Sequence, residues 1–302
     1  MGDIPAYSSS IRAMRALSQH EAAVTLAHGL SPNKIGKIGT DNVQNYLIQR
    51  DHGIGRENKL NIGLAATYYE FDHGDIDINV FNLENKRQQL LRGERKTLTV
   101  RKLESLINHA HIEAVFVLQW INTLVQHIPE LQHLKTDIAI LYRTRVAKQR
   151  LPVAPAKIHP LASSSRNETV FTDLKEALHD FLSQTGQTSD NFKKRLIPVG
   201  GDGLTYEKMV QLKEYLQFHE NEHESLETLQ PMLEWWHTEW TNLSRIYEAH
   251  WGSPLSKDPS TLGNSADKIG RKKPPNLKKV DFYTSVDLAY MVLDVRILDC
   301  WR

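Results

Sequence analysis

A strand signal that ends in a cluster of glycines constrains the fold more than any other feature of this sequence. Arg195–Val199 is apolar after its first residue and runs directly into Gly200-Gly-Asp-Gly203. Thr205 can then cap a helix that continues from Tyr206 to about Phe218. A strand, a tight glycine turn and a helix in immediate succession form the unit from which helix-covered sheets are built. The sequence therefore favours an α/β or α+β protein.

Other strand and helix patterns alternate irregularly along the chain. The apolar and aromatic run at 60–71 is the strongest further strand candidate, and a shorter strand at 34–43 precedes it, which suggests a hairpin. Helical spacing is found at 10–30, 96–145, 171–182, 226–251 and from 282 to the end. The segment 151–166 contains three prolines and a run of serines, so a loop or linker is expected there.

Composition excludes several classes of protein. The chain has 302 residues, and its 37 Lys and Arg nearly balance 36 Asp and Glu, so any site for a polyanion must be a local patch. A single cysteine, Cys300, excludes an internal disulfide framework and suits a reducing compartment. The sequence contains no apolar run of about 18 residues. We therefore expect an intracellular protein with no membrane partner, in the nucleus rather than the cytoplasm.

Two aspartates lie where a predicted strand ends. Asp41 follows the glycine-containing strand in Ile38-Gly-Thr-Asp-Asn-Val43, and Asp202 lies within the glycine turn. Short carboxylates at strand ends can hold hard divalent cations at a rigid separation, and Mg²⁺ prefers one or two such groups plus water and phosphate oxygens. Two ions held in this way could align a nucleophile for attack on a phosphodiester. Both residues also suit the simpler role of turn or cap.

Histidines suggest a different chemistry. His219-Glu-Asn-Glu-His223 matches the H-E-x-x-H pattern, in which two histidines on one helix face bind zinc and Glu220 activates water. Its charged flanks also suit a solvated helix end. His237 lies among tryptophans in Glu234-Trp-Trp-His-Thr-Glu-Trp240, where a structural role is expected.

A basic loop between 263 and 279 is a candidate nucleic-acid contact. Such a loop can bind phosphates with salt-dependent affinity, or can simply be a solvated surface. Its cations are Lys268, Arg271, Lys272, Lys273, Lys278 and Lys279.

Several of these stretches together resemble a transposon-derived family common in fungi, domain of unknown function 6589. The matching pieces are Thr40–Gln44 with Gly53–Arg56, Gly63–Thr67, Glu94–Leu98, Gly201–Thr205, Trp236-His237, His250–Gly252 and Val295–Arg302. The family usually has Gln where this chain has Gly203.

The resemblance implies a ribonuclease H-like mixed sheet interrupted by large helical insertions. On this expectation 1–33 is an N-terminal helical segment and 34–302 is the transposase-related domain, with insertions at about 96–190 and 206–262. Asp41 and Asp202 correspond to the first two catalytic acids of such folds. A third acid is not assigned, although Asp287, Asp294 and Asp299 are available. Family members usually continue beyond the last motif, so a C-terminally truncated copy is expected.

The implied function is transposase-like DNA strand cleavage or joining with Mg²⁺ or Mn²⁺ at Asp41 and Asp202, in an active or a decayed copy. Two alternatives stay open. One is a non-catalytic remnant that binds nucleic acid or protein through the retained fold. The other is a zinc hydrolase built on His219, Glu220 and His223.

Overall fold

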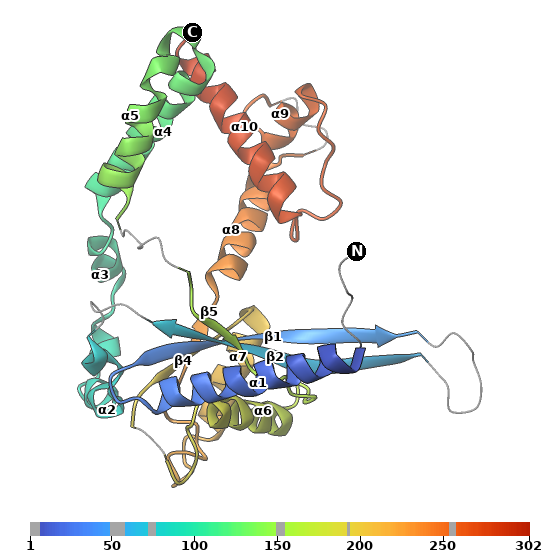
Figure 1. The fold of residues 1–302 in the computed structure, drawn as a ribbon. Coiled ribbons are helices and arrows are strands. Elements are labelled where there is room, and N and C mark those ends of the chain that lie inside the picture. The colour runs from blue at the N-terminus through green and yellow to red at the C-terminus, as the bar shows by residue number, and fades with distance from the viewer. Residues whose placement is uncertain (1–6, 49–57, 72–76, 149–154, 192–193, 254–257) are drawn as a thin grey trace. The chain divides into compact units, whose positions relative to one another are not determined.

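A computed structural model describes residues 7–48, 58–71, 77–148, 155–191, 194–253 and 258–302 (Figure 1). The chain divides into two compact units. Unit 1 comprises residues 1–94 and 155–237, and unit 2 comprises residues 95–154 and 238–302. Unit 1 combines a mixed sheet with helices, and the described part of unit 2 is helical, so the protein belongs to the mixed α/β class.

The sheet of unit 1 has five strands in the order β3-β2-β1-β4-β5. The long strands β1 (Ile35–Leu47) and β2 (Lys59–Phe71) form an antiparallel hairpin, and β3 (Ile158–Pro160) adds antiparallel to β2. On the other side β4 (Ile197–Gly201) runs parallel to β1, and β5 (Leu229–Leu233) runs parallel to β4. Every residue of β4 is buried, as expected for a strand inside a parallel sheet.

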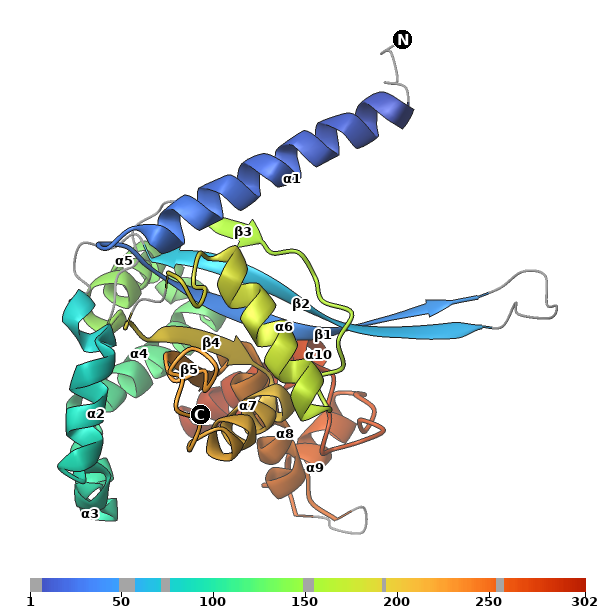
Figure 2. The ribbon, with the colours of Figure 1, turned by 90° about the horizontal axis from the view of Figure 1, so that it is seen from below.

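Helices α6 (Phe171–Gln184) and α7 (Gly203–Tyr215) cover one face of this sheet (Figure 2). Leucines of α6 and Met209 of α7 pack against Ile38 of β1 and Val199 of β4 in one core cluster. Helix α1 (Tyr7–Leu30) contacts β1, β3 and α6. The short 3-10 helix η1 (Ile78–Phe81) and α2 (Leu83–Leu91) complete the unit, with Asn82 capping α2.

Unit 2 contains two separate helical cores. Helix α4 (His109–His127), the 3-10 helix η3 (Pro129–Leu134) and α5 (Lys135–Leu141) enclose Leu118, Val125 and Ile138. The second core forms between α8 (Trp235–His250), α9 (Leu262–Lys268) and α10 (Phe282–Cys300), around the fully buried Tyr247. The remaining short elements are η2 (Glu94–Thr97), α3 (Val100–Ser105) and the π-helical turn η4 (Tyr142–Val146).

Two sequence-based assignments are wrong. The predicted helix at 226–251 is in fact β5 followed by α8, because Pro231 is unsuited to a helix interior but is tolerated in a strand at the edge of a sheet. The predicted loop at 151–166 contains β3, the opposite edge strand, which ends at Pro160. The predicted strand at 60–71 and the helices at 10–30 and 171–182 are confirmed within a few residues.

Candidate functional site

Asp41 lies inside β1, opposite Ala65 of β2, and is exposed. The backbone N–H of Asn42 donates to its Oδ1 at 2.9 Å. β1 continues to Leu47, so the prediction that the strand ends near Val43 is wrong. Asp41 therefore lies in the middle of the strand and not at its end. One carboxylate oxygen of Asp41 thus has a backbone donor.

Asp202 directly follows β4 and is the N-cap of α7. Its Oδ1 accepts from the backbone N–H of Thr205 at 2.8 Å. The prediction that Thr205 caps this helix is therefore wrong, since the helix begins at Gly203. A built Cβ at Gly203 would meet nothing within 4 Å, so no steric reason selects glycine over the Gln expected there.

The parallel pairing of β1 and β4 brings the two aspartates to neighbouring strands. Ile38 pairs with Val199 and Gly39 with Gly200. The same register would set Asp41 opposite Asp202 if it continued for two more residues, past the end of β4 at Gly201. The Thr40 hydroxyl donates to the Gly200 carbonyl at 2.8 Å, which ties the strands together beside the pair. Adjacent strands lie about 4.8 Å apart, so residues opposite each other on β1 and β4 are close enough in backbone terms to share a cation.

Glu168, which the sequence patterns did not single out, joins the segments on either side of the pair. It is 3% exposed, and its two carboxylate oxygens have different donors. The side-chain amide of Asn42 donates to Oε1 at 2.9 Å, and the Thr205 hydroxyl donates to Oε2 at 2.6 Å. Glu168 therefore links the residue after Asp41 to the first turn of the helix that Asp202 caps.

A second missed acid, Glu234, lies over the glycines of the central strands. A Cβ built at Gly200 would lie 2.0 Å from Glu234 Oε1, so a larger residue there would displace the Glu234 carboxylate. Lys37 Nζ donates to both carboxylate oxygens, at 3.0 and 3.1 Å. Because side chains alternate along a strand, Lys37, Gly39 and Asp41 share one face of β1. Asp41 therefore lies on the same face of the sheet as Glu234, whose carboxylate is paired with Lys37.

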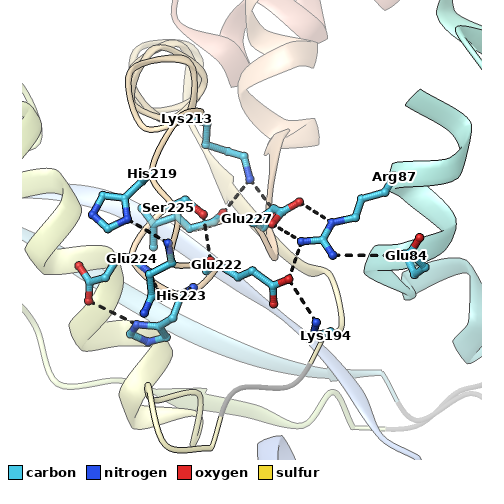
Figure 3. Close-up of polar contacts among 12 residues, drawn as sticks. Glu84, Arg87, Lys194, Lys213, His219, Glu222, His223, Glu224, Ser225 and Glu227 are labelled. Carbon is cyan, nitrogen blue, oxygen red and sulfur yellow. Dashed lines mark hydrogen bonds and ion pairs between the residues drawn. The ribbon is translucent and has the colours of Figure 1, made fainter. Parts of the chain in front are cut away.

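The H-E-x-x-H segment does not form the helical zinc motif. Helix α7 ends at Tyr215, and residues 219–228 form successive turns in which the Asn221 side chain accepts from the backbone N–H groups of His223 and Glu224. His219 and Glu220 are exposed. The prediction that both histidines point from one helix face is wrong, because the helix ends before the motif begins. Figure 3 shows His223 directed toward Glu224 instead.

His237 lies in α8 and is half-buried, with its ring edge-on to Trp236 at a centroid distance of 4.9 Å. This contact agrees with a structural role.

The basic loop belongs to unit 2, and its cations are exposed. Arg271 pairs with Asp287 at 3.3 Å, Lys278 lies 3.9 Å from Glu248, and the Lys279 ammonium lies over the Trp240 ring. Lys268 ends α9, and Lys272 and Lys273 form no ion pair with another residue that the structure describes. Three of the six cations thus have partners within the protein, and all six are exposed to solvent.

The three aspartates considered for a third acid all lie on α10. Asp294 accepts the Thr123 hydroxyl at 2.6 Å, and Asp287 pairs with Arg271. Two of the three thus have contacts within unit 2, and Asp299 faces an open pocket lined by Arg296 and Arg302.

The fold defines a mixed α/β protein in which Asp41 lies within β1 and Asp202 lies between β4 and α7. The family model of DUF6589, a family of unknown function, matches residues 93–302, and the chain belongs to this family. Asp202 lies inside the matched range, whereas Asp41 and the motif pieces at 40–67 lie before it. Neither the curated proteins nor the solved structures contain a match. Within the described residues, the helices are too short or too polar to cross a bilayer.

Proposed function

We propose that unit 1 is a ribonuclease H-like domain that carries out transposase-like cleavage or joining of DNA strands. Support comes from the strand order β3-β2-β1-β4-β5, antiparallel on one side and parallel on the other. An aspartate in the first strand and another between β4 and α7 fit the first two acids of such a site. The observation that carries the proposal is the parallel pairing of β1 with β4, which would set Asp41 opposite Asp202 if it continued for two more residues.

The residues present fit a hard divalent cation. Each aspartate uses one oxygen to accept a backbone N–H and keeps the other for a ligand role. Mg²⁺ binds through one or two carboxylates and completes its shell with water and phosphate oxygens. Bound there, Mg²⁺ or Mn²⁺ would supply Lewis-acid polarisation of a phosphodiester. Asp41 and Asp202 hold the cation, and the Glu168 bridge keeps the segments that carry them in register.

A second candidate function is favoured by the contacts of Glu168 and Glu234, whose carboxylates already have protein partners. Glu168 has a donor on each oxygen, and Glu234 is bound by Lys37. If neither carboxylate is released, the aspartate pair has no third acid from these positions. The protein would then be a binding remnant that retains the fold without cleavage.

The test is a cleavage assay on labelled duplex and branched DNA with the full chain, in Mg²⁺ or Mn²⁺. Asp41→Asn and Asp202→Asn should each lower the rate by about 100-fold or more, because each removes a charged metal ligand. Asp190→Asn, at an exposed position in a turn, is the matched control and should keep the wild-type rate. Undiminished cleavage by both variants would refute the proposal. Salt-sensitive DNA binding that survives both changes, without cleavage by the wild type, would support the binding remnant.

A further inference from the structure

A second cluster of ligand-type side chains lies in unit 1, between α6 and the turns that follow α7. His179 comes from α6, while His223 and Glu224 come from the 219–228 turns. One ligand atom from each of the three residues lies within 4.8 Å of the others. The two imidazole rings are tilted by 33° with their centroids 4.7 Å apart. Two histidines and a carboxylate are a donor set that zinc binds.

Within the described part of the chain, the two ring nitrogens of His179 are buried without a partner that explains it. Both ring nitrogens are shielded from solvent, and neither has a hydrogen bond among the described residues. Its Nε2 lies 3.9 Å from Glu224 Oε2, too far for a hydrogen bond. A buried polar atom without a hydrogen bond costs free energy, which a coordinated cation would offset.

The electrostatics keep the imidazole of His179 in the form that binds metals. Burial, followed by the neighbouring His223, lowers the pKa of His179 to about 4. The ring is therefore neutral at pH 7, as a metal ligand must be. The hydrogen bond from Lys175 lowers the pKa of Glu224, so that this group is a carboxylate.

The partners of Glu224 leave one oxygen for a cation. Lys175 Nζ donates to Oε2 at 2.8 Å, while Oε1 lies 3.6 Å from His223 Nδ1. Ligating carboxylates in metal sites commonly keep such an outer hydrogen bond, which orients them. Tetrahedral zinc places its ligand atoms about 3.4 Å apart. Side-chain movements of roughly 1 Å would bring the three ligand atoms to this separation.

The turns that carry His223 and Glu224 are held in place from the opposite side (Figure 3). Arg87 of α2 binds Glu222 at 2.7 Å and Glu227 at 2.6 Å. The Lys213 ammonium donates to the backbone carbonyls of Leu226 and Glu227. Ligand-bearing turns fixed in this way lose little entropy when a cation binds.

We propose that His179, His223 and Glu224 form a zinc site that fastens the 219–228 turns to α6. The ligands differ from those of an H-E-x-x-H hydrolase, because the exposed His219 and Glu220 take no part. Three protein ligands leave a fourth coordination position for solvent. Its role is to hold the turns against α6, and none of its ligands belongs to the aspartate pair.

The test is a zinc titration of the full chain at pH 7.5, after removal of metals with a chelator, with a chromophoric chelator as competitor. The wild type should bind a single zinc equivalent, and its Tm should rise with zinc concentration. His179→Ala and His223→Ala should each weaken binding by about tenfold or more. His219→Ala is the matched control, because this exposed residue lies on the same turns, and it should bind zinc as the wild type does.

Circular dichroism checks the fold of each variant, and Glu224→Gln provides a milder ligand change if an alanine variant does not fold. The proposal is overturned if the wild type binds no stoichiometric zinc, or if His219→Ala loses as much affinity as His179→Ala. Asp41→Asn and Asp202→Asn should retain zinc, so this site and the nuclease proposal fail or survive separately.

Discussion

At the scale of single residues, Glu168 holds the candidate site together through two hydrogen bonds. Glu168→Ala leaves the buried Thr205 hydroxyl and the Asn42 amide without their acceptor, and we expect a loss of about 1–3 kcal/mol in the free energy of unfolding. Glu168→Gln keeps one acceptor and the shape, so its loss should be smaller. Urea denaturation of both variants measures the difference, and equal losses would contradict this role.

His179 makes a residue-scale prediction about pH. Its folded-state pKa of about 4 lies below the ordinary value of 6.5, so the folded protein holds fewer protons than the unfolded chain between these values. The stability that this group contributes is complete above pH 6.5 and is lost as pH falls toward 4. The loss is on the order of 1–3 kcal/mol. The charged or titratable groups around it are His223, Glu224 and Lys175.

Denaturation midpoints measured in a chelator from pH 7 to 4 check this expectation. His179→Gln should flatten the pH dependence relative to the wild type. His219→Gln, which alters an exposed histidine, should leave the profile unchanged. Parallel profiles for the wild type and His179→Gln would show that this imidazole is not the group responsible.

Residue-scale sequence reasoning singled out Asp41 and Asp202 because apparent strand ends and glycine turns are local signals, although β1 continues past Asp41 to Leu47. It missed Glu168 and Glu234, whose partners lie 126 and 197 positions away in the sequence. No spacing rule relates such residues, since β1 pairs with β4, and β4 with β5, only in the folded sheet.

At the scale of elements, α2 is attached to the 219–228 turns chiefly through Arg87. The guanidinium binds Glu227 through two nitrogens and also reaches Glu222. Arg87→Ala should cost about 1 kcal/mol, because the ion pairs are partly exposed and solvent screens them. Arg92→Ala, on an exposed pair 3.9 Å from Glu94, is the matched control and should change stability by less than about 0.5 kcal/mol. Urea midpoints that fall equally in both variants would contradict the assigned role.

Elements with a strong local pattern were predictable, and the edge strands were not. β1 and β2 are long and β2 is rich in aromatic residues, whereas β3 has three residues and contains a proline. A run as short as β5 fits a helix or a strand equally well until its neighbours are known.

At the scale of the whole molecule, the two units have separate hydrophobic cores and should unfold as separate cooperative blocks. Phe181→Ala in unit 1 should cost about 3–5 kcal/mol, and Leu288→Ala in unit 2 about 2–5 kcal/mol. Calorimetry should show each variant shifting a different transition. A single transition that both variants lower together would contradict independent unfolding.

The class of the protein followed from the sequence, because a strand, a glycine turn and a helix are adjacent in it. The order of the strands did not, since β1 pairs with a strand about 150 residues further along the chain. Local propensity carries no information about such a pairing, because it joins segments that are far apart in the sequence and meet only when the chain folds.

That late pairing has a consequence for synthesis on the ribosome. The β1–β2 hairpin emerges early, but the strand that covers the other edge of β1 emerges only with residues 197–201. At about 5–20 residues per second, this edge stays open for roughly ten seconds or more. Nascent chains on neighbouring ribosomes can meet edge to edge during this interval. Slower initiation or bound chaperones would then raise the yield of folded protein without changing its stability.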